Sequence, residues 1–436
     1  MSADVYFGGF DESAFRALLS AADGGAALRD ARARAFEAYR ALPAPTPQDE
    51  EWRRTDPAAI PFARVRPGAP PPTRDGPLWS APEHEVFDVV ATVSEDGIGI
   101  ADRSGVIRSG KLAVERVEDR ARRAPDEIAA AWRGAAMAAA VGGGLPPDKI
   151  EAFIGAFATA GLWLETAPGA SLARGVLIHH RWRRPEFLAA WRTVARVGAG
   201  GALTVVEWIE GPAGGLLASS REIYVGEGAK ARAVTVQQAG AEAAILAVDG
   251  ARVERDGELD TVTAHVGGGW IRTKAAADLA GTGAHARLGG IAALGGRRHL
   301  DQRTLQVHSA ADTTSDLLYR AIVKDAARSV FQGVIIARRG AQRIDAYQRN
   351  NHLLLNDGAR ADSLPGLLID ADDLKCTHGA TIGHLERDAL FYLRARGLTE
   401  AAARRLLLEA FADAVVQRCP QPVLRDRMRV ALAAAE

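Results

Sequence analysis

The pattern of hydrophobic and polar residues changes twice along the chain and divides it into three regions. In the first, apolar residues recur at three- and four-residue spacing in runs such as 28–42 (LRDARARAFEAYRAL), which predicts helices with one buried face. Helix starts are also indicated at Asp11-Glu12-Ser13 and at Asp126-Glu127. The Pro-rich stretches PAPTPQDEEW and PGAPPPTRDGP predict connectors. We therefore expect a helical, Pro-rich N-terminal domain over residues 1–160.

The second region, residues 161–383, has the pattern of a β protein. Short runs such as ALTVVEWIE and RAVTVQQ alternate apolar with polar residues, which is the two-residue period of a strand with one buried face. No long helical pattern separates these runs, so a doubly wound α/β sheet is a poor fit.

A turn signal recurs through this β-rich region at intervals of 26 to 32 residues. An interval of this size, made of short strands and Gly turns, is typical of one coil of a β-solenoid. We expect Gly to supply a left-handed backbone at each corner. An antiparallel sandwich with turns at similar intervals is the alternative. The turn positions are Gly169, Gly201, Gly228, Gly257, Gly283, Ala311 and Gly340.

The third region, residues 384–436, predicts a C-terminal helical domain. One amphipathic helix ends at Arg396-Gly397, and Thr399 caps a second, which Pro420 stops. The run VLRDRMRVALAAA predicts a further short helix. Because a solenoid's last coil offers an unpaired edge, this domain is expected to cover that end, to dock a partner, or both.

Composition excludes several classes of protein. Lys+Arg (54) balance Asp+Glu (54), so no global field draws the chain to nucleic acid or to an anionic membrane. Two cysteines cannot build a disulfide framework, and the N-terminal sequence lacks the pattern of a secretory signal. No apolar run reaches the roughly 20 residues that a membrane span needs. We expect a cytoplasmic protein with free thiols.

Cys376 and His378 are the strongest candidates for chemistry. Two residues apart on a strand, they share one face, and thiolate and imidazole both suit iron, zinc or copper. Lys375 is expected to favour the thiolate. A stable metal site needs about four ligands, and this pair supplies two. A transient site shared with another subunit therefore fits better than a closed one. A packed cysteine beside a hydrogen-bonded histidine is the alternative.

The remaining polar groups indicate structural roles. The carboxylates of Asp370, Asp372 and Asp373 are expected to be solvated or bonded to local backbone rather than to form a hard-metal site. Cys419 is expected to be a helix-end residue, and the adjacent His179-His180 should point to opposite faces of a strand. The chain has no P-loop and no G-x-S-x-G elbow, so it does not resemble an ATPase or a hydrolase.

Several spaced motifs resemble the SufB/SufD family of iron–sulfur cluster assembly proteins. They are HSAADTTSDLLYRAIVKDAARSVFQGVI, then YQRNNHLLL, then DSLPGLLIDADDLKCTHGATIG, then LFYLRARGLTEAAARRLLLEAFA, in that order from Val307 to Arg418. Before Val307 the similarity is weaker and rests on PTPQDEEWRRTD and on the β-rich character. The pattern Cys-x-His-Gly-Ala-Thr-x-Gly, met from Cys376 to Gly383, resembles the SufD branch.

This resemblance implies a right-handed parallel β-helix core between helical terminal domains. It implies a non-enzymatic scaffold subunit that pairs with a SufB-like homologue, with a transient Fe–S cluster formed at their interface near His378 and, less firmly, Cys376. A SufC-type ATPase would dock on the C-terminal helices, for which Phe391, Tyr392, Leu393, Arg396 and Gly397 are the candidates. This chain itself would bind no ATP. The family is also associated with reduced flavin, for which no residue here marks a site.

Two other functions stay open at this stage. A stand-alone β-helix enzyme acting on polysaccharide would need a groove of paired carboxylates with aromatic platforms and usually a secretion signal. A homomeric metal-binding protein would use Cys376 and His378 from two copies. A homodimer is also expected as a form of the isolated chain.

Overall fold

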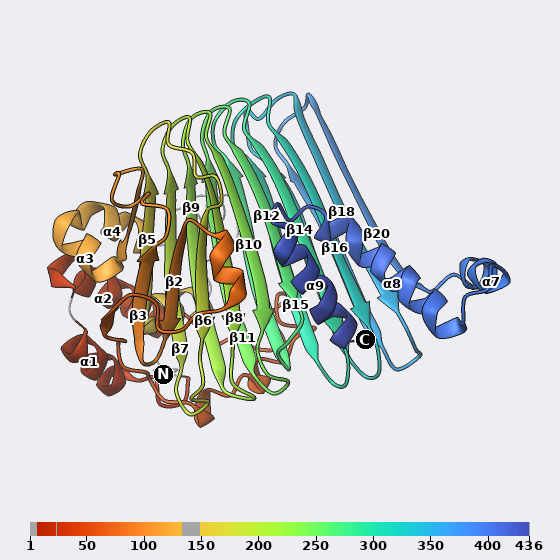
Figure 1. Cartoon of the computed structure of the whole chain (residues 1–436), viewed down its shortest axis with the longest axis horizontal. Helices are drawn as coiled ribbons and strands as arrows, with labels where there is room; N and C mark the ends of the chain where they lie inside the picture. The colour runs from red at the N-terminus through yellow and green to blue at the C-terminus, as the bar shows by residue number, and fades with distance from the viewer. Residues whose placement is uncertain (1–6, 23, 133–148, 436) are drawn as a thin grey trace.

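The chain is a parallel β-solenoid of about ten turns, with helices at its N- and C-termini (Figure 1). The computed structural model describes residues 7–22, 24–132 and 149–435. Strands one coil apart pair in parallel from β6 to β20, which confirms the predicted β-solenoid and excludes the antiparallel sandwich.

Within the described residues, the strands form two sheets of 11 and 9 strands that face each other across a lumen. In spatial order the first sheet contains β1 (Thr73–Asp75), β3 (Gly97–Asp102), β2 (Val89–Ser94), β6 (Val176–Arg181), β8 (Ala202–Glu210), β10 (Lys230–Gln238), β12 (Glu258–His265), β14 (His285–Leu294), β16 (Thr314–Val323), β18 (Ile344–Leu354) and β20 (Leu374–His384). The second contains β19 (Arg360–Ile369), β17 (Arg328–Ala337), β15 (His299–His308), β13 (Trp270–Leu279), β11 (Ala244–Val253), β9 (Leu216–Val225), β7 (Ala189–Val197), β5 (Ala160–Thr166) and β4 (Leu112–Arg116).

The hydrophobic core lies in the lumen between the two sheets. Every second side chain of a strand points inward, as Leu203 and Val205 of β8 do, and packs against inward residues of the other sheet such as Ile223. Paired positions lie 26 to 32 residues apart, from Ala244 with Trp270 to Arg328 with Arg360. This repeat places equivalent side chains in columns along the solenoid.

The corners of the coils use left-handed backbone as predicted, although the residue that adopts it differs at some of them. Gly169, Gly228, Gly283 and Gly340 all have positive φ. At the other three corners a neighbour of the predicted residue takes this conformation: Gly200, Asp256 and Asp312. Asp is among the few residue types with a side chain that tolerate a positive φ, so sequence spacing alone did not identify it.

The N-terminal helices pack on the outer face of the second sheet. Buried aromatic side chains of α2 and α6, including Phe36 and Phe153, share a core with Trp163 and Val194 of that sheet.

Strands β1 to β4, which the sequence pattern did not predict, finish the sheets at this end. The boundary near residue 160 stays a prediction. The helices of this region are α1 (Glu12–Ala21), α2 (Gly25–Ala41), α3 (Val117–Arg123), α4 (Pro125–Trp132) and α6 (Lys149–Phe157), with 3-10 turns at Pro57–Ala59, Phe62–Arg64 and Pro82–Val86.

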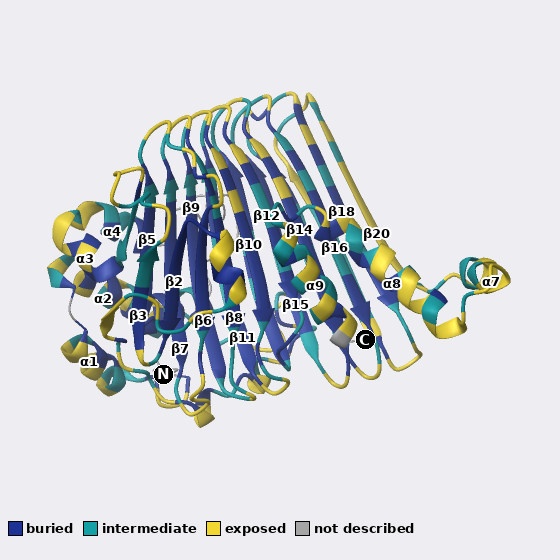
Figure 2. Cartoon of the chain, in the orientation of Figure 1, coloured by how far each residue is buried: buried dark blue, intermediate teal, exposed yellow. Residues whose placement is uncertain are grey.

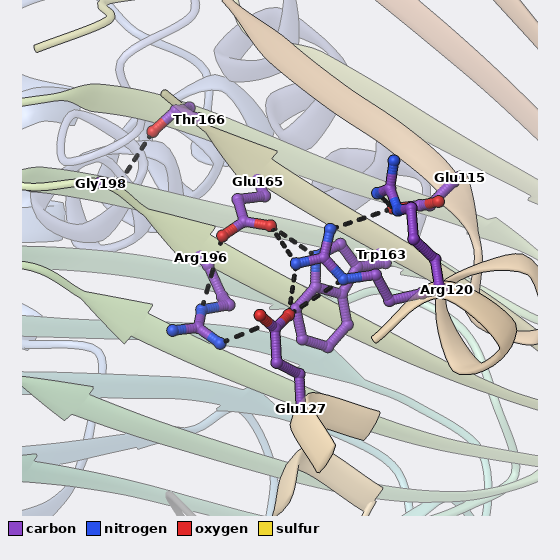
Figure 3. Close-up of polar contacts among 9 residues, drawn as sticks. Glu115, Arg120, Glu127, Trp163, Glu165, Thr166, Arg196 and Gly198 are labelled. Atoms are coloured by element: carbon purple, nitrogen blue, oxygen red, sulfur yellow. Dashed lines mark hydrogen bonds and ion pairs between the residues drawn. The ribbon is translucent and has the colours of Figure 1, made fainter. Parts of the chain in front are cut away.

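A cluster of charges joins these helices to the solenoid (Figure 3). The guanidinium of Arg120, on α3, contacts the carboxylates of three glutamates, at 3.3 Å from Glu115 and 2.6 Å from Glu165, with Glu127 as the third. It also lies 4.6 Å from the ring centroid of Trp163. We call these residues the Arg120 cluster. It connects α3 and α4 to β4 and β5.

The C-terminal helices are α7 (Arg387–Ala395), α8 (Glu400–Val416) and α9 (Pro422–Ala435). Their ends confirm the predicted signals: Gly397 has φ +94°, and the Thr399 hydroxyl accepts the Ala402 N–H at 3.2 Å. Helices α8 and α9 lie on the outer face of β14 and β16, and α7 projects away from the solenoid (Figure 1). Of the two roles considered for this domain, the cover over the last coil is not what the structure shows, because the apolar face of α8 and α9 is already buried on the first sheet.

Candidate functional site

The last coil of the solenoid ends in two exposed edge strands, β19 and β20. Among the described residues, β20 pairs with β18 and β19 with β17, and the opposite edge of each strand has no strand partner. Exposed residues run along β20 at this end of the molecule (Figure 2). Apolar side chains are exposed here too, namely Leu367, Leu368, Ile369 and Ile382, with Leu368 exposed to 48%. We call this surface the open edge.

Cys376 and His378 both lie on β20 and share its inward face. Cys376 is opposite Ala346 of β18, and His378 is opposite Gln348, whose side chain is buried in the lumen. Cys376 is partly buried against a small apolar cluster that includes Ile344, whereas His378 is exposed. The two side chains therefore border the mouth of the lumen.

Polar side chains from the preceding coil form the floor of this mouth. The Gln348 amide reaches across the lumen and donates a hydrogen bond from Nε2 to the Gly333 carbonyl at 3.2 Å. A Cβ at Gly333 would lie 2.6 Å from the amide oxygen, so the glutamine amide would have to move if this residue carried a side chain. Asn350 accepts a hydrogen bond from the Ser363 hydroxyl at 2.9 Å. The Gln348 oxygen is buried without a hydrogen-bond partner among the described residues, which leaves an acceptor beneath His378.

The electrostatics of Cys376 differ from the prediction. Burial, and after it the carboxylate of Asp345 on β18, raises the pKa of the Cys376 thiol above its ordinary value. Lys375 was expected to favour the thiolate, but burial is the largest effect on this thiol and favours its neutral form. The expectation was wrong because burial and the negative charge of Asp345, on the neighbouring strand, both oppose the thiolate. Cys376 is therefore a protonated thiol at neutral pH and must lose its proton to bind a metal.

The acidic residues before β20 do not converge on a metal position. Asp370, Asp372 and Asp373 are exposed, as predicted. The backbone N–H of Asp373 donates to the Gln342 side chain at 2.8 Å, which ties this turn to the preceding coil. Across the described ranges, no group of three or more His, Cys, Asp or Glu side chains is arranged to hold a metal ion.

The other candidate thiol and histidines are structural. Cys419 is buried between α8, α9 and the first sheet, and burial raises the pKa of its thiol to about 11. His179 and His180 point to opposite faces of β6: His179 stacks on Trp208, and His180 packs against Trp191. Both predictions are confirmed.

The candidate docking residues on and after α7 lie on its free surface. Phe391 is 74% exposed and Tyr392 is 56% exposed, although both are large and apolar. The Arg396 guanidinium stacks 5.0 Å from the Tyr392 ring centroid. Gly397 ends the helix with a left-handed backbone, and Leu393 is half-buried beside it. Helix α7 thus presents aromatic side chains that the rest of the described chain does not cover.

Sequence reasoning missed the polar floor and the apolar open edge. The signal for the floor was available in YQRNN, where Gln348 and Asn350 share the two-residue phase of inward Ala346. The open edge had no such signal, because Leu367 to Ile369 has the composition of a buried strand. Among the described residues, no helix combines the length and apolar character that crossing a membrane requires.

Comparisons with known proteins agree with this architecture. Residues 180–411 match the family described as SUF system FeS cluster assembly, SufBD core domain. An iron–sulfur cluster assembly SufBD family protein of Mycobacterium bovis is 33% identical over 227 residues, which cover 50% of this chain and 57% of that protein. The iron–sulfur cluster assembly protein SufD of Escherichia coli is 35% identical over 163 residues, 37% of this chain and 38% of that protein. SufD of Bacillus subtilis is 34% identical over 114 residues, 26% of each chain.

The matched segments thus span less than two thirds of the length of these relatives. The family match, however, covers more than half of this chain and includes the coils from β7 to β20 with Cys376 and His378. The chain therefore belongs to the SufB/SufD family of the SUF system for iron–sulfur cluster assembly.

Proposed function

We propose that this chain is a SufD-type scaffold subunit that acts without enzymatic activity of its own in a SufBCD-type complex. Two relatives that bear the name SufD, from Escherichia coli and Bacillus subtilis, are about one third identical to it over the matched segments. The Cys-x-His-Gly-Ala-Thr-x-Gly pattern of β20 supports the same branch. The family match gives no support to a stand-alone polysaccharide enzyme.

The open edge is the observation that carries this proposal. An unpaired strand exposes a row of backbone N–H and C=O groups and is a template for pairing with another strand. Here β19 and β20 also expose Leu368 and Ile382. A SufB-like homologue with a matching last coil would extend both sheets by strand addition and cover these side chains. In the absence of that homologue, a second copy of this chain is expected to use the same edge.

Pairing along this edge would place Cys376 and His378 at the seam between two subunits. Their imidazole and thiolate would supply part of the ligand set for a nascent cluster, and the partner would supply the rest. His378 is the stronger ligand of the two, because its side chain is exposed and the Cys376 thiol has a raised pKa. The Gln348 oxygen on the floor is an acceptor available to orient a liganding imidazole through its second ring nitrogen.

Helix α7 is the proposed docking element for a SufC-type ATPase. Its exposed Phe391 and Tyr392 would be buried on docking, and aromatic anchors of this kind contribute strongly to interfaces. Because α8 continues from α7 and packs on β14 and β16, a movement of the docked subunit would be transmitted to the solenoid.

Anaerobic co-expression with SufB-like and SufC-like partners tests the proposal. The wild-type complex should carry iron and sulfide, and His378→Ala should co-purify with its partners but lose most of both. His384→Ala is the matched control, because it removes an imidazole from the same strand about 20 Å away. Failure of the wild type to co-purify would contradict the complex. Full cluster content in His378→Ala would leave the complex standing but remove the ligand role.

A further inference from the structure

A hollow of about 420 Å³ lies at the row of corners where the first sheet turns into the second. It lies between the turns of four successive coils, all of which precede β20 in the sequence. Its walls are contributed by Ala241, Gly269, the turn 295–298, Lys324 and Asp325. The turn 295–298 links β14 to β15, and Lys324 and Asp325 follow β16.

Three cations line this hollow without forming a salt bridge. Within the part of the chain that the structure describes, the side chains of Arg297, Arg298 and Lys324 form no ion pair, and Arg298 Nη1 is buried without a hydrogen-bond partner. Corner arginines on the opposite row are neutralised instead by a carboxylate one coil away. Arg255 lies 2.7 Å from Glu227, and Arg343 binds Asp312 through two contacts of 2.6 Å.

Asp325, the carboxylate that lines the hollow, is engaged by the backbone. Asp325 Oδ2 accepts the N–H of Gly296 at 2.7 Å. The Asp325 backbone N–H in turn donates to the Asn356 side chain at 2.6 Å. Asp325 therefore holds two neighbouring corners together and offsets only one of the three cations. The hollow keeps an excess of two positive charges.

The glycines of the turn leave space for both the cations and a ligand. A Cβ at Gly295 would lie 2.7 Å from Lys324 Cε, so the lysine stem lies directly over the glycine backbone. At Gly296, φ is +65° and a Cβ would meet no atom within 4 Å, so this side of the turn faces open space. The lysine and the two arginines thus border a space that side chains of the turn do not fill.

We propose that this hollow binds the phosphate groups of a small diphosphate-bearing molecule. Guanidinium groups pair with phosphate oxygens through two parallel hydrogen bonds, and an ammonium adds a point charge. The volume is in the range of small-molecule sites, about 300–1,000 Å³. The turn opens a strand rather than a helix, so it has no resemblance to a P-loop, and the site is a binding site without hydrolysis. It is independent of the role proposed for His378.

Isothermal titration calorimetry of the full chain at low ionic strength tests this site, with inorganic pyrophosphate and ADP as separate probes. We expect binding in the wild type and a loss of about tenfold or more in Arg297→Gln/Lys324→Gln, because two charge-assisted contacts are removed. Both residues border the solvent, so this variant should fold. Arg298→Gln should weaken binding in the same direction. Arg255→Gln, the paired arginine of the opposite corners, is the matched control and should stay within about twofold.

The two probes also identify the source of the phosphate. Binding of pyrophosphate alone supports an inorganic ligand, and tighter binding of ADP with the same sensitivity to the double variant supports a nucleotide. No heat of binding for either probe up to about 5 mM would overturn the proposal. Equal weakening by Arg255→Gln would overturn it too, since the attraction would then be a property of the whole surface.

Discussion

Substituting Arg120 by methionine should loosen the attachment of α3 and α4 to the solenoid. The Arg120 side chain is only 9% exposed and contacts three carboxylates, which are themselves 19% to 38% exposed. Methionine keeps much of the apolar stem that packs on Trp163 but removes the charge. Arg123 would still pair with Glu115, and Arg196 with Glu127 and Glu165, but the buried cation between the three carboxylates would be lost.

The size of the effect follows from burial. Removing one partner of a fully buried ion pair costs about 3–5 kcal/mol. Because the three glutamates are partly exposed, water recovers some of that loss, and we expect about 2–3 kcal/mol. At about 1.4 kcal/mol per tenfold change, the local opening equilibrium should rise roughly 30- to 150-fold.

Hydrogen exchange measured by mass spectrometry reads this equilibrium directly. Amides of α3 and α4 should exchange roughly 30-fold faster or more in Arg120→Met, while β11 to β17 stay protected. Arg123→Met is the matched control: this arginine is on the same helix and contacts the same Glu115, but it is 62% exposed. Its change should stay below about threefold. Equal effects of the two substitutions, or no change in Arg120→Met, would refute the assignment of the Arg120 cluster as the attachment point.

Three further predictions concern the lumen and the two thiols. Gly333→Ala should lower the free energy of unfolding by about 1–3 kcal/mol because its Cβ overlaps the glutamine amide on the floor, whereas Gly366→Ala, with 3.5 Å to its nearest atom, should be close to neutral in urea unfolding. Iodoacetamide at pH 8 should label Cys376 before Cys419, whose pKa of about 11 leaves only about 0.1% thiolate; labelling of Cys419 first in the folded chain would contradict the burial argument. Burial lowers the pKa of His265 to about 4, so its contribution to stability is complete above pH 6.5 and is lost as pH falls towards 4. In His265→Leu the decline of unfolding free energy over that window should shrink by about 2–3 kcal/mol, and an unchanged decline would show that this histidine does not contribute to it.

Much of the fold was readable from local sequence. Strands such as β10 and β18 follow the two-residue alternation, and the Gly-rich turns recur at the length of one coil. The ends of α7 and α8 were predicted because Gly397 and Thr399 act on their own helix through contacts within three or four residues. Such short-range signals are independent of the rest of the chain.

Interactions between side chains of neighbouring coils could not be predicted from local sequence. Lys375 was expected to set the state of Cys376, yet Asp345, 31 positions earlier, is the charge that acts on it, because parallel pairing brings β18 beside β20. The carboxylates that neutralise Arg255 and Arg343 also come from an adjacent coil. Arg297 and Arg298 stand out as unpaired only when they are compared with these paired corner arginines, which requires the tertiary structure.

The sequence by itself determined which residues of each strand face inward, because the side-chain period of a strand is a local property. It therefore assigned Cys376 and His378 to one face of one strand. Only the tertiary structure decided that the edge of this strand, the last of the predicted β region, stays open. That outcome depends on where α8 and α9 bury their apolar face, which is on β14 and β16 rather than over the last coil.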